Sequence, residues 1–245
     1  MSSDADKVKK AEQPGLDAMK MHPFYKGKVE TILKCFVRDY DDFGIWSTPG
    51  VAKPCLDIRD NPAKVFEHTN KGNFVAVISD GTRVLGLGDI GPEASIPVME
   101  GKALLFKYLG GVDAFPVCVD TKDKDEIIMF LLQAQPCFGG VNLEDLAQPK
   151  CFDILETLRK ECKIPVWHDD QQGTATVETA GALNAVKLVG KKVQEAEVAV
   201  IGAGAAGIAI ARVMMAAGFD PKHVAMCGSK GILNMEREDL AGSYP

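Results

Sequence analysis

The stretch that decides the fold is EVAVIGAGAAG, residues 197–207. An apolar run is followed by glycines spaced G-x-G-x-x-G and then by a helix-forming segment. In a strand–turn–helix unit such glycines allow the tight turn, the approach of a pyrophosphate to the backbone, and close packing of helix on strand. The pattern predicts a dinucleotide-binding loop; the alternative is a tight turn in another kind of α/β protein. The loop residues are Gly202, Ala203, Gly204, Ala205, Ala206 and Gly207.

Upstream of this loop, apolar runs alternate with helical patterns, which is typical of an α/β protein. The expected strands are Thr31–Val37, Asn73–Ser79, Arg83–Gly88, Ala114–Val119, a run within Pro136–Asp145, Val198–Ile201 and Val224–Cys227. The expected helices are Pro62–Asn70, Val98–Tyr108, Ile127–Gln133, Cys151–Cys162, Thr174–Val189 and Ala205–Ala217. Residues 89–97 are expected to form a loop, because glycine and proline recur there.

These elements predict two domains, one over residues 1–160 and a Rossmann-like domain that starts within residues 161–245. Two strand–helix–strand halves normally build a complete dinucleotide-binding fold. Only the first half fits before Pro245. We therefore expect this second domain to be truncated or incomplete.

Composition restricts the class of protein. The 245 residues carry a net charge of −6, which disfavours nucleic acid and anionic membranes as partners. The longest apolar run, residues 198–211, is too short to span a bilayer. The seven cysteines include no C-x-x-C pair and several lie in apolar runs, so buried, reduced thiols in a cytoplasmic protein are expected.

Two pairs of adjacent carboxylates, Glu144-Asp145 and Asp169-Asp170, follow short apolar runs. Neighbouring carboxylates repel each other unless a cation lies between them, and oxygen ligands suit Mg²⁺ or Mn²⁺. Spacing alone equally allows solvated acids at the ends of loops. His168 is a further candidate ligand, although a lone histidine is more often structural.

Two cationic residues are candidates for catalysis or substrate binding. Lys102 stands beside apolar residues at the start of a helix, where a lysine can lose pKa and act as a base; the alternative is an ordinary lysine with a solvated head. Arg83 lies between a turn and an apolar run, placed either to grip a carboxylate or simply to face solvent.

Several longer motifs occur in a fixed order along the chain. They are TPGVAKPC (48–55), ISDG (78–81), LGLGDIGP (85–92), PVMEGK (97–102), NLED (142–145), HDDQQGTA (168–175) and the glycine loop. From about Gly27 onward the chain resembles the malic enzymes of the short bacterial or archaeal-like type. The order of these motifs makes the resemblance far more specific than any single one.

The resemblance implies oxidative decarboxylation of malate to pyruvate and CO₂ with NAD or NADP and Mg²⁺ or Mn²⁺. By position, Glu144, Asp145 and Asp170 match the metal ligands, and Asp169 matches an acid behind them. Lys102 matches the general base and Arg83 the arginine that binds the substrate carboxylate. The resemblance also implies a homodimer or a higher homo-oligomer.

The chain departs from the family pattern at three places. Ser47 stands where the family carries a tyrosine that protonates the enol, so we expect this step to be slow or to use water or Lys102. No carboxylate that could bind a ribose 2′-OH follows the second strand of the nucleotide domain. Ser229 and Lys230 stand there instead and favour the 2′-phosphate of NADP. The alternative is that they are merely exposed turn residues. Asparagines that the family places near the substrate would fall beyond Pro245.

Two other functions stay open at this point. One is a metal- and nucleotide-binding module with weak or lost turnover, because of Ser47 or of the early end of the chain. The other is a nicotinamide-dependent 2-hydroxy-acid dehydrogenase that does not decarboxylate its substrate.

Overall fold

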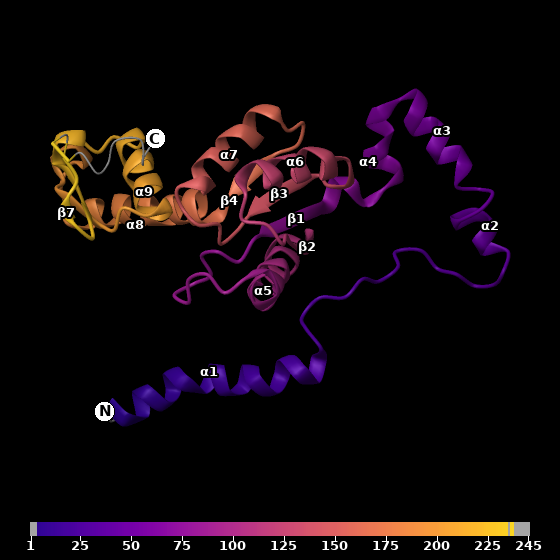
Figure 1. The fold of residues 1–245 in the computed structure, drawn as a ribbon, viewed down its shortest axis with the longest axis horizontal. Helices are drawn as coiled ribbons and strands as arrows, with labels where there is room; N and C mark the ends of the chain where they lie inside the picture. The colour runs from indigo at the N-terminus through magenta and orange to yellow at the C-terminus, as the bar shows by residue number, and fades with distance from the viewer. Residues whose placement is uncertain (1–3, 235, 238–245) are drawn as a thin grey trace.

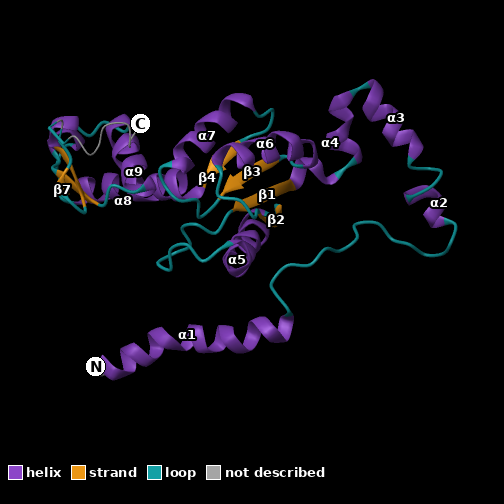
Figure 2. Ribbon diagram, in the orientation of Figure 1, coloured by secondary structure: helices purple, strands orange, loops and turns teal. Residues whose placement is uncertain are grey.

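The structure is a computed structural model that describes residues 4–234 and 236–237. Its centre is a four-stranded parallel sheet in the order β2-β1-β3-β4 (Figures 1 and 2). The strands are β1 (Phe74–Ser79), β2 (Asp113–Cys118), β3 (Gly140–Leu143) and β4 (Val166–His168). The α/β class is therefore confirmed.

Helices cover both faces of this sheet, because its strands carry apolar side chains on both sides. Val77 packs with Met99 and Ala103 of α5 (Pro92–Gly110), which lies on one face. Ala76 and Ile78 point the other way, as strand alternation requires. They join a larger core cluster with α6 (Lys124–Ala134) and α7 (Lys150–Glu161).

The C-terminal part of the chain forms a second, smaller sheet. Strands β5 (Val198–Ile201) and β6 (Val224–Gly228) are parallel, and β7 (Gly231–Ile232) pairs antiparallel with β6. They are accompanied by α8 (Thr174–Leu188) and α9 (Ala205–Ala216). Ile208 of α9 is part of the larger core cluster of the first sheet, and Met226 packs against that cluster. The two sheets are therefore joined by apolar packing.

The predicted domain boundary at residue 160 stays a prediction. Strand β4 follows that boundary in sequence, yet it pairs with β3 in the first sheet. The π-helical turn η4 (Asp169–Gly173) then leads directly into α8.

The N-terminal part of the chain projects away from this body (Figure 1). It begins with α1 (Asp4–Tyr25) and continues through residues 30–60, which we call the arm. The arm contains α2 (Asp42–Trp46) and α3 (Ala52–Asp60), and Asp42 is its only buried residue. The short helices η1 (Pro62–Lys64), α4 (Val65–His68) and η2 (Asn70–Asn73) lead back to β1.

Three expectations from the sequence are wrong. Thr31–Val37 forms no strand, because it lies in the arm with no strand beside it to complete hydrogen bonds. Arg83–Gly88 forms a loop rather than a strand, since Leu85 and Gly88 have φ values of 48° and 80° that interrupt an extended chain. Residues 92–97 are helical, because Pro92 occupies the first turn of α5, where a missing N–H costs nothing.

The other expected strands and helices are confirmed to within a few residues. Helix α5 ends as expected at the glycine pair, with Gly111 in the left-handed conformation (φ 67°). Asn61 caps η1 by accepting a hydrogen bond from the backbone N–H of Ala63.

Among the described residues, no helix is long and apolar enough to cross a membrane. All seven cysteines are unpaired thiols, but only Cys151 is buried. The expectation of several buried thiols is therefore corrected, because most of these residues lie near element ends or in the arm.

Candidate metal and nucleotide site

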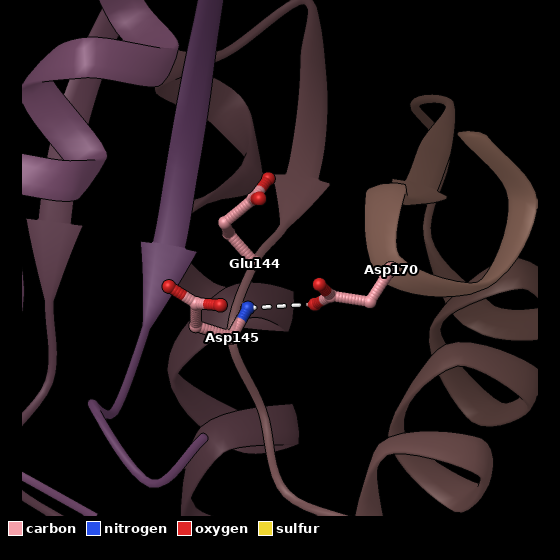
Figure 3. Close-up of side chains that lie close together, drawn as sticks. All are labelled: Glu144, Asp145 and Asp170. Atoms are coloured by element: carbon pink, nitrogen blue, oxygen red, sulfur yellow. Dashed lines mark hydrogen bonds between the residues drawn. The ribbon is translucent and has the colours of Figure 1, made fainter. Parts of the chain in front are cut away.

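The two acidic pairs meet at the carboxyl edge of the first sheet. Glu144 and Asp145 follow β3, and Asp169 and Asp170 follow β4. Because β3 and β4 are parallel neighbours, their ends lie at the same edge. One carboxylate oxygen from each of Glu144, Asp145 and Asp170 lies within 4.8 Å of the others (Figure 3). We call these three residues the acidic cluster.

Hydrogen bonds hold the acidic cluster in this arrangement. The Asp145 backbone N–H donates to Oδ2 of Asp170 over 2.8 Å, which joins the two strand ends (Figure 3). Asn142, on β3, donates from Nδ2 to Oε2 of Glu144 over 2.8 Å. Asp145 has a φ of 55°, an unusual backbone conformation for a residue other than glycine. Such conformations persist where the surrounding structure imposes them, often at functional sites.

The turn that carries Asp169 and Asp170 depends on Gly173. A Cβ atom on Gly173 would lie 2.2 Å from Oδ1 of Asp169, closer than atoms can approach. The turn itself, η4, is a π-helical turn, a form that is frequent at functional sites. Glycine at this position therefore allows Asp169 to fold back over the turn.

Burial disfavours the charged forms of Glu144 and Asp145 in the acidic cluster. Desolvation raises the pKa of Glu144 to about 7, although the Lys102 charge opposes it. Desolvation and the neighbouring Asp170 charge raise the pKa of Asp145 to about 6. Oδ2 of Asp145 is buried and has no hydrogen-bond partner within the described part of the chain. A hard divalent cation would offset the desolvation of Glu144 and of Asp145, and it would give the buried Oδ2 of Asp145 a partner. These oxygen donors therefore fit Mg²⁺ or Mn²⁺.

Lys102 lies at the rim of the acidic cluster. Its Nζ donates to Oδ2 of Asp169 over 2.7 Å and lies 3.3 Å from Oε1 of Glu144. Burial lowers the pKa of Lys102, but the hydrogen bond with Asp169 and the two carboxylate charges outweigh it, so the net shift is upward. The apolar neighbours in sequence do not determine this pKa, because the lysine faces carboxylates that lie far away in sequence.

Arg83 lies beside the same cluster, in the loop that follows β1. Its backbone N–H donates to the carbonyl of Asp145 over 3.0 Å, and its charge lowers the pKa of Asp145. Its guanidinium donates only to the carbonyl of Leu85 among the described residues, at 3.3 Å, and the side chain is exposed. The loop is fixed beneath it by the fully buried Asp80, which pairs with Lys150 and accepts from Thr82.

Two residues of this site were missed or undervalued in the sequence. Asn142 is buried and orients Glu144; its signal is a polar residue in an otherwise apolar strand. His168 is fully buried, and neither ring nitrogen has a hydrogen-bond partner in the described part of the chain. Desolvation lowers the pKa of His168, so the ring is neutral behind Asp170, whose Oδ2 lies 3.9 Å from Nδ1. The burial of this side chain followed from tertiary packing that no local pattern showed.

The glycine loop connects β5 to α9 as expected. Gly202 has a φ of 124°, and a Cβ on Gly207 would lie 1.9 Å from the carbonyl oxygen of Gly202. Both glycines are therefore required by the turn and by the packing of helix on strand. Gly204 has open space around its Cβ position, where a pyrophosphate can approach the N-terminus of α9.

Ser47 lies apart from Lys102, Arg83, Asp169 and the acidic cluster. It follows α2 in the arm and is exposed, and the arm projects from the opposite end of the molecule's body from α8 and α9 (Figure 1). Within one chain, the structure therefore brings together Lys102, Arg83, Asp169 and the acidic cluster, but not Ser47.

Comparison with known proteins identifies this arrangement. The family model described as malic enzyme, N-terminal domain, matches residues 26–159, and that described as malic enzyme, NAD binding domain, matches residues 171–243. The chain belongs to the malic enzyme family. The Rossmann-like character of the second sheet and the predicted resemblance are thus confirmed.

The bifunctional malic/malolactic enzyme of Bacillus subtilis is 52% identical over 217 residues, covering 89% of this chain and 52% of that protein. The NADP-dependent malic enzyme of Haemophilus influenzae is 42% identical, covering 93% of this chain and 30% of that protein. The crystal structure of the Entamoeba histolytica malic enzyme has 47% identity and a TM-score of 0.94, covering 98% of this chain and 51% of that chain. This malic enzyme chain thus spans about half the length of these relatives or less.

Proposed function

We propose that this chain forms the substrate and metal site, and the first half of the nucleotide site, of an NAD(P)-dependent malic enzyme. The reaction is oxidative decarboxylation of malate to pyruvate and CO₂. The observation that carries this proposal is the position of Lys102, between Asp169 and Glu144 and at the rim of the acidic cluster. A proton acceptor, a cation site and a dinucleotide loop are the parts that such a reaction needs.

In this proposal Glu144, Asp145 and Asp170 hold Mg²⁺ or Mn²⁺, which would supply positive charge to the oxygens of the substrate. Lys102 donates to Oδ2 of Asp169 over 2.7 Å, so its ammonium can pass one proton to that carboxylate. The neutral amine that results then takes the proton of the malate hydroxyl. Arg83 is exposed at the mouth of the site, where its guanidinium can bind a substrate carboxylate.

A bound nicotinamide nucleotide would supply the acceptor for the hydride of malate. Gly202, Gly204 and Gly207, with Ala203, Ala205 and Ala206 between them, present backbone N–H groups at the start of α9 to its pyrophosphate. Ser229 and Lys230 lie at the turn between β6 and β7. The positive charge of Lys230 favours the 2′-phosphate of NADP. The relatives include both NAD- and NADP-dependent malic enzymes, so both nucleotides belong in the test.

A cytoplasmic location and a homo-oligomer also belong to this proposal. Seven unpaired thiols suit a reducing compartment. Exposed apolar side chains along the arm and α5 suit association with another protein surface.

Turnover of the intact protein that carries this chain tests the proposed function. Malate, Mn²⁺ and either NAD or NADP should give reduced nucleotide and pyruvate in equal amounts. Oxaloacetate in place of pyruvate would identify a dehydrogenase that does not decarboxylate. Binding of Mn²⁺ and nucleotide without turnover would identify a binding module.

Replacing Lys102 tests the role of the proton acceptor. Lys102→Met should lower kcat by about 10²- to 10⁴-fold, the usual contribution of a general base. Lys107→Met is the matched control, because Lys107 lies on the same helix and pairs with Asp113 instead of with the site. An equal loss in both variants would count against the proposed role of Lys102.

A further inference from the structure

Two loops at the carboxyl edge of the first sheet carry residues of the site. The β1 loop, residues 80–91, follows β1 and contains Arg83, and the β3 loop, residues 144–149, follows β3 and contains Glu144 and Asp145. Because β1 and β3 are paired, both loops start side by side. Malate held by Arg83 and by a cation in the acidic cluster would therefore reach from one loop to the other.

The β1 loop is closed at its base, so that it carries Arg83 as one unit. The backbone N–H of Ile90 donates to the carbonyl of Gly81 over 3.1 Å. Gly81 has a φ of 69°, and a Cβ there would lie 2.1 Å from the carbonyl oxygen of Gly91. Val84, next to Arg83, is fully buried. A shift of the base of this loop therefore moves Arg83 with it.

Thr82 joins the β1 loop to the β3 loop. Its Oγ1 donates to Oδ1 of Asp80 over 2.6 Å and accepts a hydrogen bond from the backbone N–H of Ala147 over 2.9 Å. The backbone N–H of the next residue, Arg83, donates to the carbonyl of Asp145 over 3.0 Å. The bonds from Ala147 and from Arg83 both cross between the loops, and the first of them depends on the Thr82 hydroxyl.

Lys150 connects the bases of these two loops with a third segment. It is the first residue of α7, and its side chain is 17% exposed. Its Nζ pairs with the fully buried Asp80 and donates to the carbonyl of Lys122 over 3.0 Å. Lys122 lies in the segment that follows β2. One ammonium group thus holds together segments that follow β1, β2 and β3, and neither of these partners belongs to the acidic cluster.

The backbone of the β3 loop needs such support. Asp145 has a φ of 55°, a conformation that costs energy and persists only where its surroundings impose it. The Arg83 N–H and the Thr82 hydroxyl act on this loop from the β1 loop. The hydroxyl in turn is held by Asp80, a buried carboxylate whose cationic partner is Lys150. The relative position of Arg83 and Asp145 therefore depends on Thr82 and Lys150.

We propose that Thr82 and Lys150 are positioning residues, which fix Arg83 at a set distance from the acidic cluster so that one malate can contact the guanidinium and the cation at once. The inference rests on the proposed function for the identity of the substrate. The locking of the two loops does not require activity.

Hydrogen exchange of the intact protein tests the locking directly. Thr82→Val removes the hydroxyl and should speed amide exchange in residues 81–85 and 145–149 by about 3- to 10-fold, as expected for one lost hydrogen bond. Residues 154–158, in the buried part of α7, should exchange as in the wild type. Thr82→Ser keeps the hydroxyl and should show the wild-type rates. Unchanged exchange of both loops in Thr82→Val would overturn the proposal.

Steady-state kinetics with saturating Mn²⁺ and nucleotide test the positioning role. Thr82→Val should raise the KM for malate by about 10-fold or more and change kcat by less than about 3-fold, because the grip on a carboxylate is the same in the ground state and the transition state. Thr82→Ser should restore the wild-type values. A loss in kcat alone, an unchanged KM, or an equal loss in the serine variant contradicts the role.

Replacing Lys150 gives a second test of the same role. Lys150→Met leaves Asp80 buried without its cation, so it should raise the KM for malate at least as much as Thr82→Val does. Lys124→Met is the matched control, since Lys124 pairs with Asp153 on the surface. An equal rise in both lysine variants, or an unchanged KM in Lys150→Met, counts against the proposal.

Two further outcomes are assigned in advance. If Lys150→Met does not fold, Thr82→Val decides, because that variant keeps the pair of Asp80 with Lys150. A wild type that turns over no malate rejects the proposed function, whereas the exchange of the two loops judges the locking whether or not the protein is active.

Discussion

The acidic cluster and the arm both carry residues that match positions of the malic enzyme site, but they are built in opposite ways. In the cluster Glu144 and Asp145 are buried and Asp170 is half-buried, and each is placed by a strand end or by a hydrogen bond within the chain. In the arm, Asp42 is the only buried residue, and Ser47 touches none of the other site residues. The difference shows that one part of the site depends on sheet topology, whereas no contact within the described residues joins Ser47 to that part.

Removing one ligand should have the largest effect on the cluster. Asp170→Asn takes away a charge and also one acceptor of the bond that joins the two strand ends. We expect Mn²⁺ affinity to fall by at least about 100-fold, because even residues behind a metal ligand cost 10- to 100-fold. Titration calorimetry with Mn²⁺ measures this. Asp153→Asn is the control, since Asp153 pairs with Lys124 on the surface, and an equal loss there would break the assignment.

The pH dependence of stability should also separate the two regions. The pKa values of Glu144 and Asp145 are raised to about 7 and about 6, so the folded chain keeps these protons longer than the unfolded chain does. The resulting stability is complete below pH about 4 and is lost as pH rises through about 6 and 7, by roughly 3 kcal/mol for Glu144 alone.

Thermal unfolding in a chelator between pH 4 and pH 8 measures this loss. Glu144→Gln should flatten the pH profile, and Mn²⁺ at pH 8 should restore stability to the wild type but not to that variant. A profile that is already flat in the wild type contradicts the assigned burial of charge. Variants of the arm should not change the profile between pH 4 and pH 8, because the hydrogen bond from Arg38 lowers the pKa of Asp42 and so moves its titration below this range.

A matched pair of glycine variants extends the comparison to the nucleotide loop. Gly207→Ala should lower the free energy of unfolding by about 1–3 kcal/mol, because its Cβ would lie 1.9 Å from the Gly202 carbonyl oxygen. Gly204→Ala should leave stability nearly unchanged, since nothing lies within 4 Å of its Cβ position. It should instead weaken nucleotide binding. Denaturant unfolding and NAD(P) titration measure the two effects, and equal destabilisation by both variants is the contradicting result.

The smallest effect on folding is expected in the arm. Ser47→Tyr should change the free energy of unfolding by no more than about 0.5 kcal/mol, as is usual for an exposed position. In the intact enzyme it should raise kcat, since a phenol is a better acid than a serine hydroxyl and is longer. Ser47→Phe is the control that adds the ring without the hydroxyl. Equal rates in the Tyr and Phe variants would exclude a proton donor at this position.

The contrast between the acidic cluster and the arm also explains which features of the fold and the site the sequence could predict. Short apolar runs that end at turn or acidic residues predict the strands at residues 74–79 and 140–143, but they do not predict that these two strands pair. The glycine loop was predicted from its three spaced glycines, because both the turn and the helix packing restrict those positions sterically.

Features set by distant packing were not predictable. The upward pKa shift of Lys102 comes from Asp169 and Glu144, which are far away in sequence. The apolar run at residues 31–37 has the composition of a strand, yet it pairs with no strand among the residues that the structure describes. The composition of a segment shows that it is apolar, but it does not show what the segment packs against.

The continuity of β4, η4 and α8 has a consequence for the way ligands communicate. Asp170 lies in the five-residue turn η4, and α8 leads from that turn toward the nucleotide loop. Any rotation of α8 about this turn moves Asp170 relative to Glu144 and Asp145, which stay with β3. A nucleotide that fixed the orientation of α8 would therefore also fix the position of Asp170. In that case each ligand would raise the affinity for the other by an equal factor, as thermodynamic linkage requires.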